Sequence, residues 1–146
     1  MHAWFHVALG RLQQLSGNAN EGRESFTQAQ EPLEKELKQQ PQDANLALIL
    51  AETLTGLGER EAALRWADRA VELLPSSHDA RSGPAFEETR ARIQARFGDG
   101  DRAIPTLKHL LEIPYAGPIT PALLRLHPDF DPLRGDPRFQ ELCKDK

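Results

Sequence analysis

Few residues of this chain have the types and spacing that metal binding requires. His2 and His6 lie four residues apart, which is metal-ligand spacing on one helix face, but no glutamate follows His2 and no third ligand is signalled. Asp99 and Asp101 flank a glycine as at the start of a calcium loop, yet Leu110 stands where such a loop needs a glutamate. We therefore expect no bound metal, and interpret these residues as a helix end and a turn.

Catalytic chemistry has no stronger support. Asp129 and Asp131 are conceivable as an acid/base pair, but they lie in a turn bounded by prolines, where aspartate commonly caps a helix or turn. The chain has no Gly-x-Ser-x-Gly sequence, no glycine-rich phosphate loop before a lysine and no Cys-His arrangement. We predict no catalytic residue, no cofactor and no enzymatic activity.

The composition excludes two classes of partner. The 146 residues carry a net charge of -4 with both signs interspersed, so no basic stripe is available for a nucleic acid backbone. The longest strongly apolar run, Leu46 to Ala51, is far shorter than the ~20 residues that cross a bilayer. The first ten residues lack the pattern of a secretory signal, and the single cysteine, Cys143, permits a reducing compartment. We favour the cytoplasm, or the periplasm if the segment is fused to a membrane-anchored regulator.

The elements that must position any functional residue are helices. Apolar spacing and turn residues predict three helix pairs, at about 3–41, 43–75 and 84–113, so that residues 1–113 form the paired region. In the first pair, Gly17 ends the first helix, and Pro32 predicts a kink or break of the second at Gln30 or Glu31. The apolar residues at helical spacing in the first helix are Phe5, Ala8, Leu9, Leu12 and Leu15.

In the second and third pairs, the residues that begin and end each helix are easier to identify. Asp43 is a plausible N-cap, and Gly58 separates two helices whose close approach is favoured by Ala63 and Ala67. In the third pair Gly98 ends the first helix, and with Asp101 as the N-cap, Pro105 would lie near the start of the second.

Residues 114–146 form a proline-rich tail. Six of the eleven prolines lie there, so only short helices are expected, at about 121–126 and 136–144, the latter with Asp136 as N-cap and Pro137 at the first helical position. The tail also holds too many apolar residues to remain in water. We predict that it packs on the last pair and caps it.

The repeated pattern of glycine, alanine five residues later and apolar residues at helical spacing recurs with a period of about 34 residues, which is typical of tetratricopeptide repeats. The segment LLEIP at 110–114 and the segment LLRLHPDFDPLRGDPRF at 123–139 resemble the C-terminal end of such arrays in bacterial regulators. In those proteins the arrays follow serine/threonine kinase, cyclase-like or winged-helix transcription modules. The resemblance implies an all-α, right-handed α-α superhelix of three helix pairs with a short helical C-terminal cap.

The resemblance also implies a binding groove. The first helix of each pair lines a concave surface, and Arg11, Glu52 and Arg92 fall at equivalent positions, which predicts a stripe of alternating charge. Such a stripe suits a peptide of mixed charge, and it equally fits solvated charges or internal ion pairs. The predicted groove residues are Trp4, Val7, Arg11 and Gln14 in the first pair, Asn45, Leu48, Glu52 and Thr55 in the second, and Ala85, Glu88, Arg92 and Ala95 in the third.

One specialised partner is disfavoured. Chaperone-binding members of the family grip a C-terminal carboxylate with lysine, asparagine and arginine. The corresponding positions here carry Val7, Arg11, Ile49, Ala85 and Thr89, which do not match that clamp.

The resulting functional prediction is a protein-protein interaction scaffold that binds a peptide or protein surface, without nucleic acid or membrane contact. The alternative is a C-terminal sensory or regulatory domain of a larger bacterial kinase or transcription regulator, without independent binding activity. Trp4 and Phe5 suggest a third option, a homodimer through that end of the chain, while Trp66 fits either a core position or a partner contact.

Overall fold

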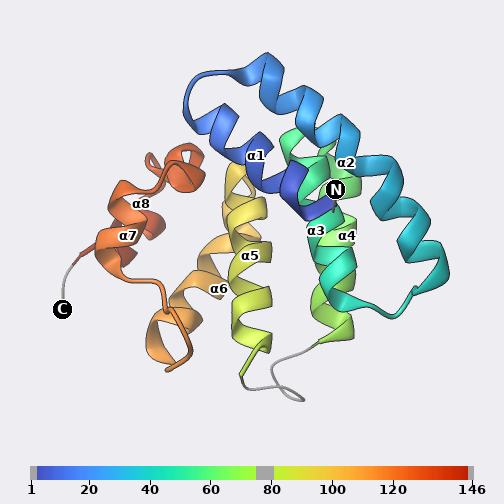
Figure 1. Cartoon of the computed structure of the whole chain (residues 1–146). Coiled ribbons are helices and arrows are strands. Elements are labelled where there is room, and N and C mark those ends of the chain that lie inside the picture. The colour runs from blue at the N-terminus through green and yellow to red at the C-terminus, as the bar shows by residue number, and fades with distance from the viewer. Residues whose placement is uncertain (1–2, 75–80, 145–146) are drawn as a thin grey trace. The chain divides into compact units, whose positions relative to one another are not determined.

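A computed structural model describes residues 3–74 and 81–144, and every regular element in these ranges is helical (Figure 1). The predicted all-α class is thereby confirmed. Helices follow one another as neighbouring pairs, and the chain divides into two compact units, unit 1 up to Leu73 and unit 2 from Leu74. The elements are α1 (Ala3–Leu15), α2 (Ala19–Gln39), α3 (Ala44–Gly56) and α4 (Arg60–Leu73) in unit 1, and α5 (Gly83–Arg96), α6 (Gly100–Glu112), α7 (Pro121–Leu126), the 3-10 helix η1 (Pro128–Leu133) and α8 (Pro137–Leu142) in unit 2.

Three helical hairpins close with the same turn. Gly17, Gly58 and Gly98 have φ angles of 85°, 77° and 75°, a left-handed conformation that glycine adopts without steric cost. In each turn the glycine N–H donates to the carbonyl three residues earlier, and the following N–H donates to the carbonyl five residues before it. These glycines lie 41 and 40 residues apart. The spacing exceeds the predicted period of about 34 because α2 has 21 residues and residues 74–82 separate α4 from α5.

Unit 1 is held together around Phe26, whose side chain is 0% exposed. A Cβ atom at Gly10 of α1 would lie 3.0 Å from the Phe26 ring, and one at Gly56 of α3 would collide with the same ring. A Cβ at Gly22 would also lie 2.9 Å from the Gly10 carbonyl oxygen. The Phe26 ring therefore fills a space, the glycine notch, which is left because α1 and α3 carry Gly10 and Gly56 where they contact the ring.

The second hairpin, α3 with α4, uses small residues in the same way. Ala63 and Ala67 are fully buried where α4 packs on α3, as the sequence predicts. The Asp43 side chain accepts a hydrogen bond of 3.1 Å from the Leu46 N–H, which confirms it as the N-cap of α3.

Two prolines of the described residues lie inside α-helices, beyond the first turn. Of the kink or break expected at Gln30 or Glu31, the break is absent, because α2 continues through Pro32 to Gln39. Pro105 also lies well inside α6, which begins at Gly100 with Asp99 rather than Asp101 at the N-cap position. Both prolines are exposed, as are the residues four positions earlier, so water can reach the carbonyl that each proline leaves without a donor.

In unit 2 the tail packs against α5 and α6. Phe130 and Phe139 are buried, with ring centroids 5.8 Å apart in a stacked arrangement. The shared core combines α5 and α6 with the tail: Ala91, Ala95, Ala103, Ile104, Leu107, Leu110, Ile119, Leu124, Phe130, Leu133 and Phe139.

The tail keeps its irregular path through local hydrogen bonds. The Thr120 side chain caps α7 by accepting from the Leu123 N–H at 3.1 Å, and Asp136 caps α8 by accepting from the Arg138 N–H at 2.9 Å, as the sequence predicts. Arg134 donates to the carbonyl oxygen of His127 at 2.9 Å and to that of Leu124 at 3.1 Å, so it binds the C-terminal end of α7. The three short helices of the tail each begin with a proline, namely Pro121, Pro128 and Pro137.

Candidate partner-binding surface

The predicted groove residues of unit 1 lie on α1 and α3. Arg11 Nη1 and Glu52 Oε1 are 3.8 Å apart, with both side chains half-buried. Gln14 Nε2 donates to the Gly56 carbonyl oxygen at 2.9 Å. These contacts join α1 to α3 and create a shared face that carries both signs of charge.

The other groove residues of unit 1 divide into accessible and buried positions. Trp4 and Asn45 are exposed and Leu48 is half-buried, so each can present side-chain surface to a ligand. Val7 is 3% exposed and Thr55 is 5% exposed. The Thr55 hydroxyl donates to the Ala51 carbonyl oxygen at 2.7 Å. Val7 and Thr55 therefore belong to the interior of unit 1, and the accessible face, the α1/α3 face, consists of Trp4, Arg11, Gln14, Asn45, Leu48 and Glu52.

Two of the corresponding residues of unit 2, Glu88 and Arg92, contact the tail. Arg92 Nε lies 3.0 Å from Glu88 Oε2, and Arg92 Nη1 lies 3.4 Å from Asp129 Oδ2. The Arg92 guanidinium also stands 5.6 Å from the centroid of the Phe130 ring. The Tyr115 hydroxyl donates to Glu88 Oε1 at 2.7 Å. The outward face of α5 thus already binds a polypeptide segment, which is the chain's own tail.

The two alanines predicted for this part of the groove differ. Ala85 is exposed, whereas Ala95 is fully buried in the core that α5 shares with the tail.

Asp129 is the centre of the contact between the tail and α5. It is 5% exposed, and its carboxylate lies near Arg92, near Arg96 at 3.9 Å and near His127 Nδ1 at 3.5 Å. The Asp129 N–H donates to His127 Nδ1 at 3.1 Å, so this nitrogen acts as an acceptor. Asp131 is exposed and pairs with Arg134 at 2.8 Å. The two aspartates thus make separate structural contacts.

Tyr115 belongs to the same contact between the tail and α5. Burial and the hydrogen bond to Glu88 raise the pKa of Tyr115 to about 12. Because the pKa is raised above its ordinary value of 10.0, the stabilisation from the Tyr115 hydroxyl is complete below pH 10 and is lost as the pH rises toward 12.

We expect Glu88→Gln to lower the pKa of Tyr115 toward 10, because it removes the carboxylate that favours the protonated phenol. Tyr115 is the only tyrosine, so tyrosinate absorbance at alkaline pH measures this titration directly. Glu87→Gln, at the neighbouring position of α5, is the matched control and should leave the midpoint in place. An unchanged midpoint in Glu88→Gln would contradict the assigned hydrogen bond.

The two aspartates considered for metal binding have other partners. Asp99 lies 3.6 Å from Arg102 and Asp101 lies 3.0 Å from Arg138. His2 is outside the described residues. Within 3–74 and 81–144, no three histidine, cysteine, aspartate or glutamate side chains are grouped so that they could hold a metal ion.

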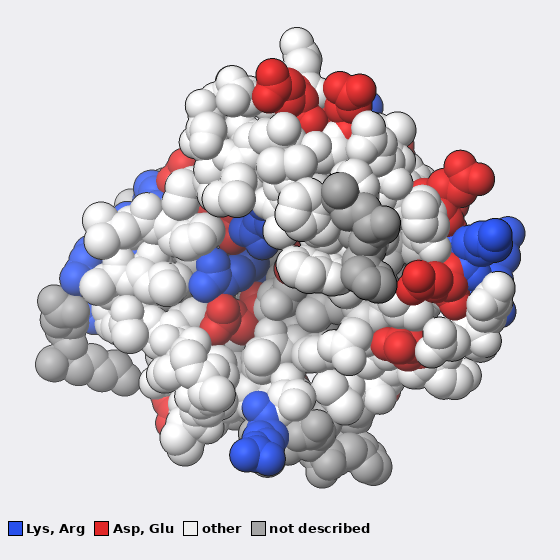
Figure 2. All heavy atoms as spheres, viewed as in Figure 1, with Lys and Arg blue, Asp and Glu red and all other residues white. Residues whose placement is uncertain are grey.

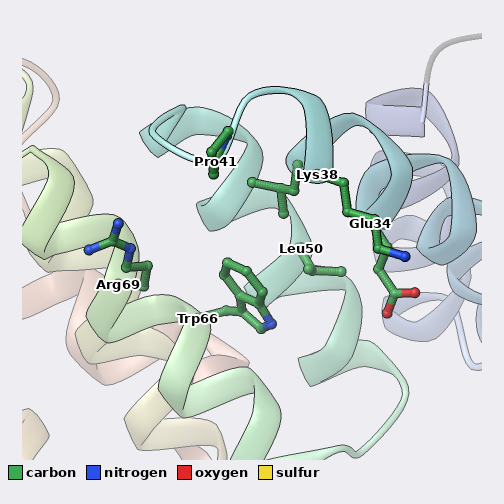
Figure 3. A pocket seen from close by; sticks show the side chains of 7 residues that line it. Glu34, Lys38, Pro41, Leu50, Trp66 and Arg69 are labelled. Atoms are coloured by element: carbon green, nitrogen blue, oxygen red, sulfur yellow. The ribbon is translucent and has the colours of Figure 1, made fainter.

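Unit 1 also contains a recess of about 460 Å³ between α2, α3 and α4 (Figure 3). Leu37 and Leu50 are buried beneath it, and the half-buried Trp66 ring forms one wall. Figure 3 shows Glu34 and Lys38 on α2 across from Trp66, with Arg69 on α4. An apolar floor with a charged rim has the dimensions and character of pockets that accept one anchoring side chain.

The sequence pattern misplaced the inner face of α1. Its buried residues are Val7 and Gly10, whereas its exposed residues are all apolar: Trp4, Phe5, Ala8, Leu9, Leu12 and Leu15. Two glutamines turn inward instead, since Gln13 Oε1 accepts from the Ser25 hydroxyl at 2.7 Å and Gln14 donates to Gly56. The signal in the sequence was Gly10, a small residue that permits close helix contact on the side opposite the large apolar residues.

In the described part of the chain, no helix has both the length and the apolar character that are needed to cross a bilayer. The chain matches no family model, no curated protein and no solved structure.

Proposed function

We propose that this chain is a protein-interaction module of the tetratricopeptide type, which binds a peptide or a protein surface through the α1/α3 face of unit 1. The observation that supports this proposal is a difference between α5 of unit 2 and the α1/α3 face of unit 1. On α5, an arginine and a glutamate at predicted groove positions hold the chain's own tail. On the α1/α3 face, Arg11 and Glu52 stand between accessible residues of unit 1.

The side chains of the α1/α3 face define the ligand. Trp4 offers a flat apolar surface, and Arg11 and Glu52 offer one charge of each sign at half-buried positions, where ion pairs are less screened than in bulk water. The proposed ligand is therefore an extended segment with an apolar side chain flanked by charges of both signs. Binding of this kind depends on the order of the charges along the segment as well as on their number.

The proposal predicts that exchanging the two charges weakens ligand binding about tenfold while unit 1 remains folded. The variant is Arg11→Glu/Glu52→Arg, which keeps an ion pair and the net charge but reverses its direction. The matched control is Glu61→Arg/Arg65→Glu, a swap of two exposed residues on α4.

Peptides selected from a random library displayed on phage provide the ligands, and calorimetry measures their affinities. Equal affinity for wild type and both swapped variants would contradict the assignment of the α1/α3 face. Failure to select any peptide against the folded chain would contradict the interaction function itself.

A further inference from the structure

The six most exposed residues of α1 are all apolar, and we call them the α1 stripe. Its large members are unusually accessible for an amphipathic helix in a folded unit. Their exposed fractions are 58% for Trp4, 44% for Phe5, 36% for Leu9, 63% for Leu12 and 56% for Leu15, and Ala8 completes the stripe.

The spacing of the stripe is that of a helix which pairs with another helix. Phe5, Ala8, Leu12 and Leu15 are separated by three, four and three residues, which matches the a and d positions of two consecutive heptads. Trp4 and Leu9 lie beside this seam. A partner helix can therefore lie along the whole length of α1.

The seam is complementary to itself when two copies run antiparallel. In that arrangement a positions face d positions. Phe5 then meets Leu15 of the second copy, and Ala8 meets Leu12, so a small residue faces a large one at the centre. A twofold axis between the copies reproduces both contacts on the other half of the seam.

The lack of charge on the α1 stripe and its exposed apolar area both favour a second copy of the chain as its binding partner. The stripe contains no charged residue, so identical surfaces can meet without repulsion between like charges, and the surface over α1 in Figure 2 is largely white. From the exposed fractions, the stripe offers on the order of 500 Å² of apolar surface per copy. Two copies would bury about 1,000 Å², which reaches the lower limit for a specific interface.

We propose that the α1 stripe is a homodimer interface in which α1 packs antiparallel against α1 of a second copy. Arg11 and Glu52 lie outside the stripe, but Trp4 belongs to both the stripe and the α1/α3 face, so a dimer that covers Trp4 competes with the proposed ligand for that side chain. The inference does not depend on the proposed peptide-binding function.

The first experiment measures the mass of the full chain by sedimentation equilibrium from about 1 to 300 µM. We expect a reversible dimer for the wild type. Leu12→Lys and Leu15→Lys should each raise the dissociation constant at least ~100-fold, because every dimer would then bury two unpaired ammonium groups. Leu126→Lys is the matched control, since Leu126 is 80% exposed in unit 2, and it should remain a dimer.

The second experiment tests the antiparallel register. In a Cys143→Ser background, chains carrying Ala8→Cys are mixed with chains carrying Leu12→Cys and oxidised. The antiparallel register predicts cross-linking mainly between the two different chains, whereas a parallel register would cross-link each variant with itself.

The outcomes separate the proposal from its competitors. A wild type that stays monomeric at 300 µM overturns it, including when hydrogen exchange shows α1 protected by another part of the same chain. A dimer that persists in both lysine variants, with circular dichroism unchanged, places the interface elsewhere and also overturns it. Peptide binding that survives in monomeric Leu12→Lys shows that the α1/α3 face acts independently.

Discussion

Replacing Phe26 by alanine is expected to lower the free energy of unfolding of unit 1 by about 3 to 5 kcal/mol. The ring is 0% exposed, so its apolar surface is lost entirely from the core. Gly10 and Gly56 contact the ring with backbone alone, so neither position has a side chain that could fill the cavity. A unit of this size has a total stability of only several kcal/mol, so the variant should be largely unfolded at 37 °C.

Tryptophan fluorescence during urea denaturation measures this change in unit 1 alone, because Trp4 and Trp66, the only tryptophans, both belong to that unit. The control Leu126→Ala removes an exposed side chain from unit 2 and should leave the midpoint within error. A loss below 1 kcal/mol in Phe26→Ala would show that the glycine notch collapses or that the ring is not central.

The double variant Gly56→Ala/Phe26→Ala tests the notch itself. Gly56→Ala alone should cost about 1 to 3 kcal/mol, since its methyl group meets the Phe26 ring. With the ring removed, the same methyl group enters free space, so the two losses should not add. Additive losses would mean that Gly56 and Phe26 act through different contacts.

The paired helices were predictable because their signals are local. Glycine in a left-handed turn, aspartate at an N-cap and proline at the first helical position each depend on a few neighbouring residues. Gly58, Asp43 and Asp136 accordingly occupy the roles that the sequence predicts. Only the alternative of a break in α2 was wrong, because the cost of Pro32 depends on whether water reaches the carbonyl left without a donor.

The orientation of α1 required information that its own sequence lacks. Apolar residues lie on several sides of this helix, so periodicity alone does not determine which side is buried. The deciding contacts are distant: Phe26 against Gly10, and Gly56 as acceptor for Gln14. A face that contains glutamine was buried because each inward-facing amide has a hydrogen-bond partner.

The candidate site was predictable in part for a similar reason. Placing Arg92 on the outward side of α5 followed from helical spacing, but its partner Asp129 lies 37 residues later in the chain. No local pattern indicates that an arginine at this position binds a distant segment of the same chain. The structure of unit 2 shows that contact, in which Asp129 is buried.

Replacing Arg92 by methionine is expected to destabilise the packing of the tail on α5 by about 2 to 4 kcal/mol, because it leaves the Asp129 carboxylate, 6% exposed, without its nearest arginine. The substitution keeps much of the apolar stem but removes the ion pairs with Glu88 and Asp129 and the cation over Phe130. Arg96 remains at 3.9 Å and compensates only in part, whereas His127 Nδ1 accepts a hydrogen bond from the Asp129 N–H and offers the carboxylate no proton.

The titration of Tyr115 distinguishes a released tail from a docked one, since the two states move its pKa in opposite directions. Arg92 lowers the pKa of Tyr115, so its loss from a docked tail would keep the value at or above about 12. Release of the tail would remove burial and the Glu88 hydrogen bond and return the pKa toward 10. We expect the pKa of Tyr115 to move toward 10 in Arg92→Met. In Arg92→Met/Asp129→Leu we expect it to return part of the way toward 12, because the double variant buries no unpaired charge. A double variant less stable than Arg92→Met would show that the Asp129 carboxylate stabilises the tail through Arg96 rather than through Arg92.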